Sequence, residues 1–160
     1  MRAVRVEDGQ LQIRDVPTPE PRWQEALVRI DAAGVCHSDL HLARREWAGI
    51  PGIGVLGHEG IGVVEALGPG AEQFVNVGDR VILGLGGSGG GYWCGACEYC
   101  LSGRPRHCAQ GKGIMGTFAE EFSVWAPSLV TLPDSLGDDE APLACGGLTA
   151  YGAVKKLHKY

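Results

Sequence analysis

The sequence predicts a mainly β domain in which short strands form a barrel. Apolar and polar residues alternate in seven short runs, which is the period of a strand with one buried face. Segments between these runs are rich in Gly, Pro, Asn and Asp, the residues that tight turns require. Many short strands within 160 residues favour one barrel-like domain of ordinary size with a real core.

The predicted strands can be located in order along the chain. They cover residues 3–6, 11–16, 26–32, 61–67, 79–83, 118–125 and 129–133. The clearest turn segments separate them at residues 7–10, 17–22, 67–72 and 76–79.

Two segments have helical spacing instead. Residues 38–47 form one, with Ser38 as its expected N-cap. Near the end, Asp138 or Asp139 can cap a first turn, and a connecting helix is predicted at about 146–158. Its apolar residues at helical spacing are Leu148, Tyr151 and Val154.

Charge and hydropathy exclude several classes of partner. The net charge is −5 with no basic block, which argues against nucleic acid or an anionic membrane as the main partner. No apolar run approaches about 18 residues, and the N-terminus lacks the apolar region of a signal peptide. These features favour a cytoplasmic protein, where clustered cysteines are more often metal ligands or catalytic groups than disulfides.

Four of the six cysteines, Cys94, Cys97, Cys100 and Cys108, have the spacing C-x2-C-x2-C-x7-C. Two intervening residues let neighbouring sulfurs face one ion, and four thiolates with no open position are typical of structural zinc. An iron–sulfur cluster is the nearest alternative, but ferredoxins continue with a gap of three and Cys-Pro, whereas Ala109 follows Cys108 here. Disulfides or free thiols are the third reading.

A glycine-rich segment precedes this lobe and fits G-x-G-x-x-G, the spacing of a dinucleotide-binding turn. With 26 glycines in the chain, roughly 0.7 such matches arise by chance. A binding turn must also open a helix, which none of the three matches is expected to do. The three matches are Gly52/Gly54/Gly57, Gly84/Gly86/Gly89 and Gly111/Gly113/Gly116.

The other two cysteines suggest a second metal site. Cys36 lies in GVCHSDLH and Cys145 in PLACGGLTAY, while LGHEG carries His58 and Glu59. Two thiolates and one imidazole with an open fourth position make a catalytic zinc arrangement. A lone histidine is more often structural, so spacing alone leaves this site open.

In the order in which they occur, GVCHSDLH, GHEGIGVVEALG, the four-cysteine lobe and CGGLTAY closely resemble the N-terminal catalytic portion of zinc-dependent medium-chain alcohol dehydrogenases. The resemblance covers essentially the whole chain. It implies a GroES-like distorted β-barrel with short helices and a zinc-held lobe over residues 1–160. Members of the family continue into a nucleotide-binding domain, which this sequence lacks.

The resemblance also implies roles for individual residues. Cys36, His58 and Cys145 match the ligands of the catalytic zinc, and Glu59 matches an alternative ligand. Asp39 matches a carboxylate that orients the ligand histidine. Ser38 and His41 match a proton relay, although a helix cap and an exposed helix residue are the plainer readings. His37 and Thr149 match positions that contact the cofactor.

This resemblance implies alcohol oxidation with two zinc ions, one catalytic and one structural. Because zinc has no redox chemistry, NAD or NADP must accept the hydride. The implied partners are an alcohol or carbonyl substrate, the nucleotide-binding domain and, in the complete enzyme, further copies of the chain. One departure is Gly90, where relatives often place an aromatic residue that faces the substrate.

Two other readings remain. A non-catalytic zinc-stabilised module would need Cys94 to Cys108 but not Cys36, His58 and Cys145 together. A zinc-free quinone reductase of the same superfamily is disfavoured by both cysteine sets.

Overall fold

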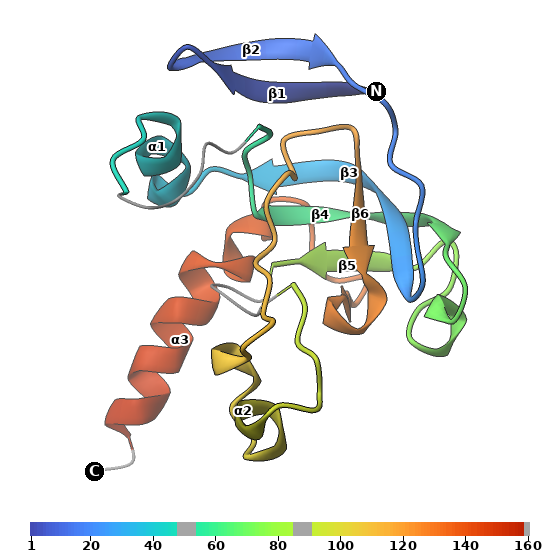
Figure 1. Ribbon diagram of the computed structural model, residues 1–160, viewed down its shortest axis with the longest axis vertical. Helices are drawn as coiled ribbons and strands as arrows, with labels where there is room; N and C mark the ends of the chain where they lie inside the picture. The colour runs from blue at the N-terminus through green and yellow to red at the C-terminus, as the bar shows by residue number, and fades with distance from the viewer. Residues whose placement is uncertain (48–53, 85–90, 159–160) are drawn as a thin grey trace.

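The computed structural model describes residues 1–47, 54–84 and 91–158, and its first element is a β-hairpin (Figure 1). β1 (Arg2–Glu7) pairs with β2 (Gln10–Asp15) in antiparallel register. The two turn residues, Asp8 and Gly9, both have positive φ (50° and 75°). Positive φ at both central positions matches the right-handed twist of the strands that the turn joins.

A five-stranded antiparallel sheet forms the centre of the domain, with strand order β6-β3-β4-β5-β7. Its strands are β3 (Glu25–Gly34), β4 (Glu59–Leu67), β5 (Arg80–Leu83), β6 (Glu121–Trp125) and β7 (Val130–Thr131). Irregular register interrupts the β3–β4 pairing at two places. The described sheet ends at β6 and β7 without closing, so the predicted barrel is present in a distorted, open form.

Backbone hydrogen bonds fasten the hairpin to the central sheet. Val4 N–H donates to the carbonyl of Phe118 at 2.8 Å, and Glu120 N–H donates to the carbonyl of Arg2 at 3.0 Å. Val6 N–H donates to the carbonyl of Gly54 at 3.1 Å. The hairpin therefore covers the segments leading into β4 and β6. In Figure 1 it lies above the sheet.

Small and branched apolar side chains fill the core against the central sheet. Burying them supplies the main favourable contribution to folding. The buried cluster consists of Ala26, Val28, Val64, Ala71, Val75, Val81, Leu83, Ile114, Val124 and Ala126.

The helices are short except at the end of the chain. The α-helices are α1 (His37–Ala43), α2 (Glu98–Leu101) and α3 (Gly146–Leu157). The 3₁₀ turns are η1 (Ala71–Gln73), η2 (Pro105–His107), η3 (Ala126–Ser128) and η4 (Ala141–Ala144). No residue of α3 is buried, and Figure 1 shows this helix extending away from the sheet. Among the described residues, no helix is long and apolar enough to cross a membrane.

Each of the seven predicted strand segments contains or overlaps an observed strand, so the strand prediction is confirmed. The helix predictions need two corrections. α1 ends at Ala43 rather than at residue 47, and its N-cap is Cys36 rather than Ser38. Neither Asp138 nor Asp139 caps η4, whose N-cap is Glu140; the carboxylate of Asp138 instead accepts a hydrogen bond from Arg80 at 2.6 Å.

At Gly62, β4 approaches its neighbour β3 closely. A Cβ placed on this residue would lie 1.9 Å from the carbonyl oxygen of Arg29. Backbone atoms cannot move aside as a flexible side chain can, so any side chain here must displace a strand.

Replacing Gly62 with alanine should therefore lower the free energy of unfolding by about 2–4 kcal/mol, measured by urea denaturation of metal-saturated protein. Gly152→Ala is a matched control, since a Cβ there meets nothing within 4 Å and the residue lies inside α3. The control should be neutral or stabilising by about 0.5–1 kcal/mol. Equal stabilities of the two variants would contradict the close strand contact.

Candidate metal centres

The first candidate centre begins where β3 leads into α1. Cys36 is the N-cap of α1, and its backbone N–H donates to Oδ2 of Asp39 at 3.0 Å. The N–H of Asp39 donates in return to the carbonyl of Cys36 at 3.0 Å. This reciprocal cap holds Cys36 and Asp39 in a defined relation at the first turn.

Asp39 connects this turn to the start of β4. It is 2% exposed, and its Oδ1 accepts the N–H of Gly57 at 3.1 Å and lies 3.2 Å from Nδ1 of His58. Gly57 has φ of +90°, a conformation that glycine adopts without the cost a side chain would impose. Because Nδ1 faces Asp39, Nε2 remains as the ring nitrogen able to bind a metal.

The pKa values of this pair are shifted in opposite directions. The hydrogen bond with Asp39 raises the pKa of His58 to about 9, although burial opposes the shift. Burial raises the pKa of Asp39, but the bond to His58 and the amides of Cys36 and Gly57 bring it below its usual value. A charged carboxylate at Asp39 is therefore favoured, and it increases the electron-donating strength of the His58 ring.

Four side chains from separate parts of the chain meet beside this pair. The ligand atoms of Cys36, His58, Glu59 and Cys145 all lie within 4.8 Å of one another. The sulfurs of Cys36 and Cys145 are 3.9 Å apart, close to the roughly 3.8 Å between two thiolates on a tetrahedral zinc with 2.3 Å bonds. Glu59 is 3% exposed. The donor set and its spacing fit a tetrahedral metal ion.

Acidic groups at this centre repel one another. Burial raises the pKa of Cys36, but hydrogen bonds from Ser38, His58 and Cys145 outweigh it and lower that pKa. The pKa of Cys145 is raised to about 11 by burial and then by the neighbouring Cys36 and Glu59. A divalent cation would relieve this repulsion and let both thiols ionise.

The second candidate centre is the four-cysteine lobe around α2. The ligand atoms of Cys94, Cys97, Cys100 and Cys108 lie within 4.8 Å of one another. Sulfur separations are 3.6 Å for Cys97 and Cys100 and 4.0 Å for Cys94 and Cys100, again near the tetrahedral value of about 3.8 Å. All six cysteines of the chain are free of disulfides.

Backbone amides support the sulfurs of this lobe. Cys94 N–H donates to the sulfur of Cys108 at 3.3 Å, and Cys97 N–H donates to that of Cys94 at 3.3 Å. The amides of Cys100 and Ala109 lower the pKa of Cys97 to about 6, whereas burial and the adjacent thiols raise that of Cys100 to about 12. A cation shared by the four sulfurs would remove this inequality.

The other predicted site residues lie around the first centre. Ser38 is half-buried, and its backbone and side chain hydrogen-bond to Cys36. His41 lies one turn further along α1, with a side chain 34% exposed. His37 and Thr149 are exposed, and Thr149 N–H donates to the carbonyl of Cys145 at 2.9 Å.

The glycine patterns do not form a dinucleotide-binding turn in the described residues. Gly111, Gly113 and Gly116 precede strand β6 rather than a helix. The other two patterns include Gly52, Gly86 and Gly89, and these residues and Gly90 lie outside the described ranges.

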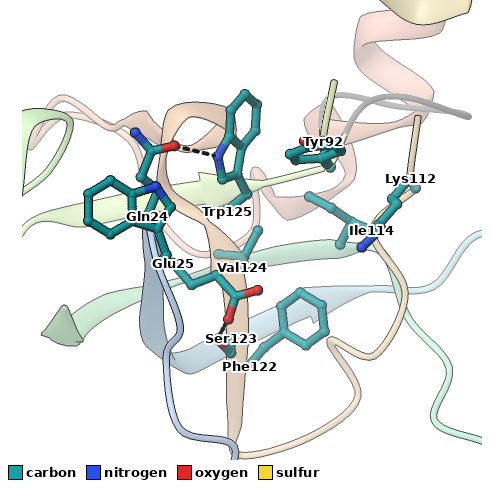
Figure 2. Close-up of a pocket in the computed structure, with 12 residues that line it drawn as sticks. Gln24, Glu25, Tyr92, Lys112, Ile114, Phe122, Ser123, Val124 and Trp125 are labelled. Atoms are coloured by element: carbon teal, nitrogen blue, oxygen red, sulfur yellow. Dashed lines mark hydrogen bonds between the residues drawn. The ribbon is translucent and has the colours of Figure 1, made fainter. Parts of the chain in front are cut away.

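A separate cavity of about 470 Å³ lies beside the edge strand β6 (Figure 2). Gln24, Trp125, Tyr92 and Lys112 are among the residues that line it, and the rings of Trp125 and Tyr92 meet edge to face with centroids 5.0 Å apart. Trp125 Nε1–H donates to Gln24 at 3.5 Å, a contact within the wall itself. None of the predicted site residues lines this cavity, so it is not the candidate centre.

Two residues that contact predicted site residues were not themselves assigned a role from the sequence. Gly57 supports Asp39 through its N–H, and Glu46 lies against His41. Only the glycine immediately before the LGHEG histidine and an acidic residue five positions after His41 could have drawn attention to them.

The chain thus combines an antiparallel β domain with two groups of side chains that could each hold a metal ion, one of four cysteines and one of two cysteines, a histidine and a glutamate. Residues 22–134 match the model of the alcohol dehydrogenase GroES-like domain. The chain belongs to this family, that of the medium-chain alcohol dehydrogenases.

Relatives and solved structures agree with the assignment. An alcohol dehydrogenase of Geobacillus stearothermophilus is 42% identical over 91% of this chain and 43% of its own length. One of Moraxella sp. (strain TAE123) is 37% identical over 96% of this chain and 46% of its own. The alcohol dehydrogenase of Aeropyrum pernix superposes with a TM-score of 0.84 at 35% identity, over 98% of this chain and 48% of that structure. The acetophenone reductase of Geotrichum candidum, in complex with NAD, gives 0.80 at 32%, over 97% and 47%. The chain thus spans less than half the length of each.

Replacing Asp39 with asparagine should weaken metal binding at the first centre by about 10–100-fold, because the neutral amide no longer strengthens the His58 ring. Chelator competition with purified protein measures the affinity of each centre. Metal held by Cys94 to Cys108 provides the internal control and should be unaffected. Loss of affinity at both centres would indicate general unfolding, and loss at neither would contradict the role of Asp39.

Proposed function

We propose that this chain is the substrate- and metal-binding half of a zinc-dependent enzyme that interconverts alcohols with aldehydes or ketones. The observation that carries the proposal is the convergence of Cys36, His58 and Cys145, with thiolate sulfurs 3.9 Å apart, in a domain of the alcohol dehydrogenase family. Three ligands leave a fourth position for substrate, as catalytic zinc sites require.

Zinc is the metal that the donor chemistry favours at both centres. Thiolate and imidazole ligands in a tetrahedral arrangement suit zinc better than the oxygen-preferring magnesium or calcium. Glu59, buried beside Cys145, is the alternative ligand when the substrate position is empty. The four-cysteine lobe leaves no open position and is the structural site.

At the reactive centre, bound zinc supplies a Lewis acid that makes an alcohol easier to deprotonate. Asp39 holds the His58 ring through Nδ1, so that the ring presents Nε2. Ser38, which hydrogen-bonds to Cys36, is the group to which we assign acceptance of the alcohol proton. His41, one turn along the same face of α1, passes that proton toward bulk water.

The hydride requires an acceptor, and we assign that role to NAD or NADP. His37 and Thr149, both exposed near the first centre, are the candidate contacts to it from this chain. The acceptor itself would be held by a nucleotide-binding domain that follows residues 1–160, with α3 as the connecting helix. The complete enzyme would form homo-oligomers, and the six free cysteines fit the reducing cytoplasm.

Metal analysis tests the zinc assignment. Protein purified without chelator should contain about two zinc ions per chain. Cys97→Ala should lose one equivalent and destabilise the domain, since metal binding at a structural site contributes folding free energy. Cys36→Ala should also lose one equivalent, from the other centre. Iron in place of zinc, or two zinc ions retained after either substitution, would overturn the assignment.

Activity is tested by joining the chain to the nucleotide-binding half of a related alcohol dehydrogenase. The joined protein should reduce NAD or NADP with one or more of a panel of alcohols, while residues 1–160 alone should show negligible turnover because no acceptor is positioned. Cys36→Ala in the joined protein should abolish turnover. Cys97→Ala, which removes a ligand of the other centre, is the comparison that shows how much turnover is lost through destabilisation alone. Sustained turnover by residues 1–160 alone would show that our proposal assigns the cofactor site to the wrong part of the enzyme.

A further inference from the structure

A carboxylate that the proposed function leaves unused lies against the relay histidine. Oε2 of Glu46 is 2.5 Å from Nδ1 of His41. Both side chains are partly exposed, His41 to 34% and Glu46 to 43%. Arg44 also lies near Glu46, with Nη1 3.8 Å from Oε1.

The end of α1 brings these two side chains together. Arg45 adopts the left-handed conformation, with φ of 55°, directly after the C-cap Arg44. The N–H of Glu46 then donates to the carbonyl of His41 at 2.9 Å, and that of Arg45 to the carbonyl of Leu42 at 3.1 Å. These bonds are the Schellman pattern, which pairs the second residue after the cap with the third from the end of the helix. Here those residues are Glu46 and His41.

Aromatic contacts further restrict the ring. The centroid of His41 lies 5.4 Å from that of Trp47 at an interplanar angle of 26°, and 4.7 Å from that of His37. Trp47 follows Glu46 directly, so the same turn supplies both contacts. Rotation of the imidazole would break the hydrogen bond and the stacking together.

We infer that Glu46 is a positioning residue of the proton relay: it holds Nδ1–H of His41 so that Nε2 alone exchanges protons. The inference rests on the relay assigned to Ser38 and His41 under the proposed function. As Ser38 receives the alcohol proton and releases its own along the relay, Nε2 accepts a proton and then returns it to water. Nδ1–H stays bonded to Glu46 throughout, so the ring ends the cycle as it began.

The charges around the ring agree with this role. The hydrogen bond from His41 lowers the pKa of Glu46; burial opposes this shift, and the charges of His41, Arg44 and His37 add to it. Glu46 is therefore a carboxylate at neutral pH. The charged or titratable groups recorded around His41 in the described chain are Glu46 and His37, with Arg44 beyond Glu46.

A double-mutant cycle in the complete enzyme tests the inference. Glu46→Ala should lower kcat about 10-fold with KM changed by less than about 2-fold, because the ring loses its orientation while substrate binding is untouched. In a His41→Ala background the same substitution should lower kcat by less than about 2-fold, since Glu46 acts through His41. Glu46→Asp should recover part of the lost kcat. Glu46→Gln keeps a hydrogen-bond acceptor but removes the negative charge, so its kcat distinguishes the effects of the two.

Arg44→Ala is the matched control. It removes the ion pair with Glu46 but leaves the contact with His41, and kcat should remain within about 2-fold of the parent enzyme. Zinc content should be the same in every variant. An undiminished kcat in Glu46→Ala, or an equal loss in the presence and absence of His41, would overturn the inference.

Nitrogen-15 NMR provides a readout that does not depend on turnover. At a pH where the ring is neutral, long-range couplings should place the proton of His41 on Nδ1 in the parent protein and on Nε2 for a substantial fraction of Glu46→Ala. The same tautomer in both proteins would overturn the inference. If Ser38→Ala and His41→Ala both leave kcat unchanged, the proposed relay itself is wrong. If His41→Ala lowers kcat but Glu46→Ala does not, the relay stands and only the role of Glu46 is overturned.

Discussion

The buried carboxylate of Asp39 is the constraint on which the first centre depends. It accepts the amides of Cys36 and Gly57 and the ring of His58, so one side chain joins the start of α1 to the start of β4. A buried charge without such partners would be strongly destabilising, and these groups are therefore held together in the folded state. Two of the three zinc ligands in our proposal take their positions from this interaction.

The central sheet brings Cys36 and His58 near each other, and the hydrogen bonds of Asp39 then fix their relative positions. β3 and β4 pair up to Gly34 and Glu59, which places the segments carrying Cys36 and His58 at the same end of the sheet. A Cβ on Gly34 would lie 2.2 Å from Oε2 of Glu59, so a side chain here would push the buried carboxylate out of its position. η4 packs on both strands and delivers Cys145 to the same place. The centre is thus a product of strand register and of one glycine that lets the carboxylate approach.

The two centres differ in how they are built. The lobe is local: a short helix, a 3₁₀ turn and backbone amides direct four sulfurs that lie close in sequence. The first centre draws its ligands from three segments and can form only when the sheet has formed. A structural metal therefore stabilises its own loop, whereas the proposed reactive metal reports on the fold of the whole domain. The proposed relay adds a third case, in which a single left-handed residue after α1 returns Glu46 and Trp47 to His41.

The sequence by itself determined the strands and the lobe. Alternation of apolar residues located all seven strands, and C-x2-C spacing over the 14 positions from Cys94 to Cys108 leaves few ways to arrange the sulfurs. The ends of α1 were mispredicted, because the cap at Cys36 and the left-handed Arg45 depend on backbone hydrogen bonds that composition does not reveal, whereas α3 lies close to its predicted bounds. Cys36 and Cys145 are 109 positions apart, so resemblance could suggest the pair but no local pattern could bring it together. Only the tertiary structure decided that meeting, because strand pairing and the burial of Asp39 are interactions between residues that the chain itself keeps apart.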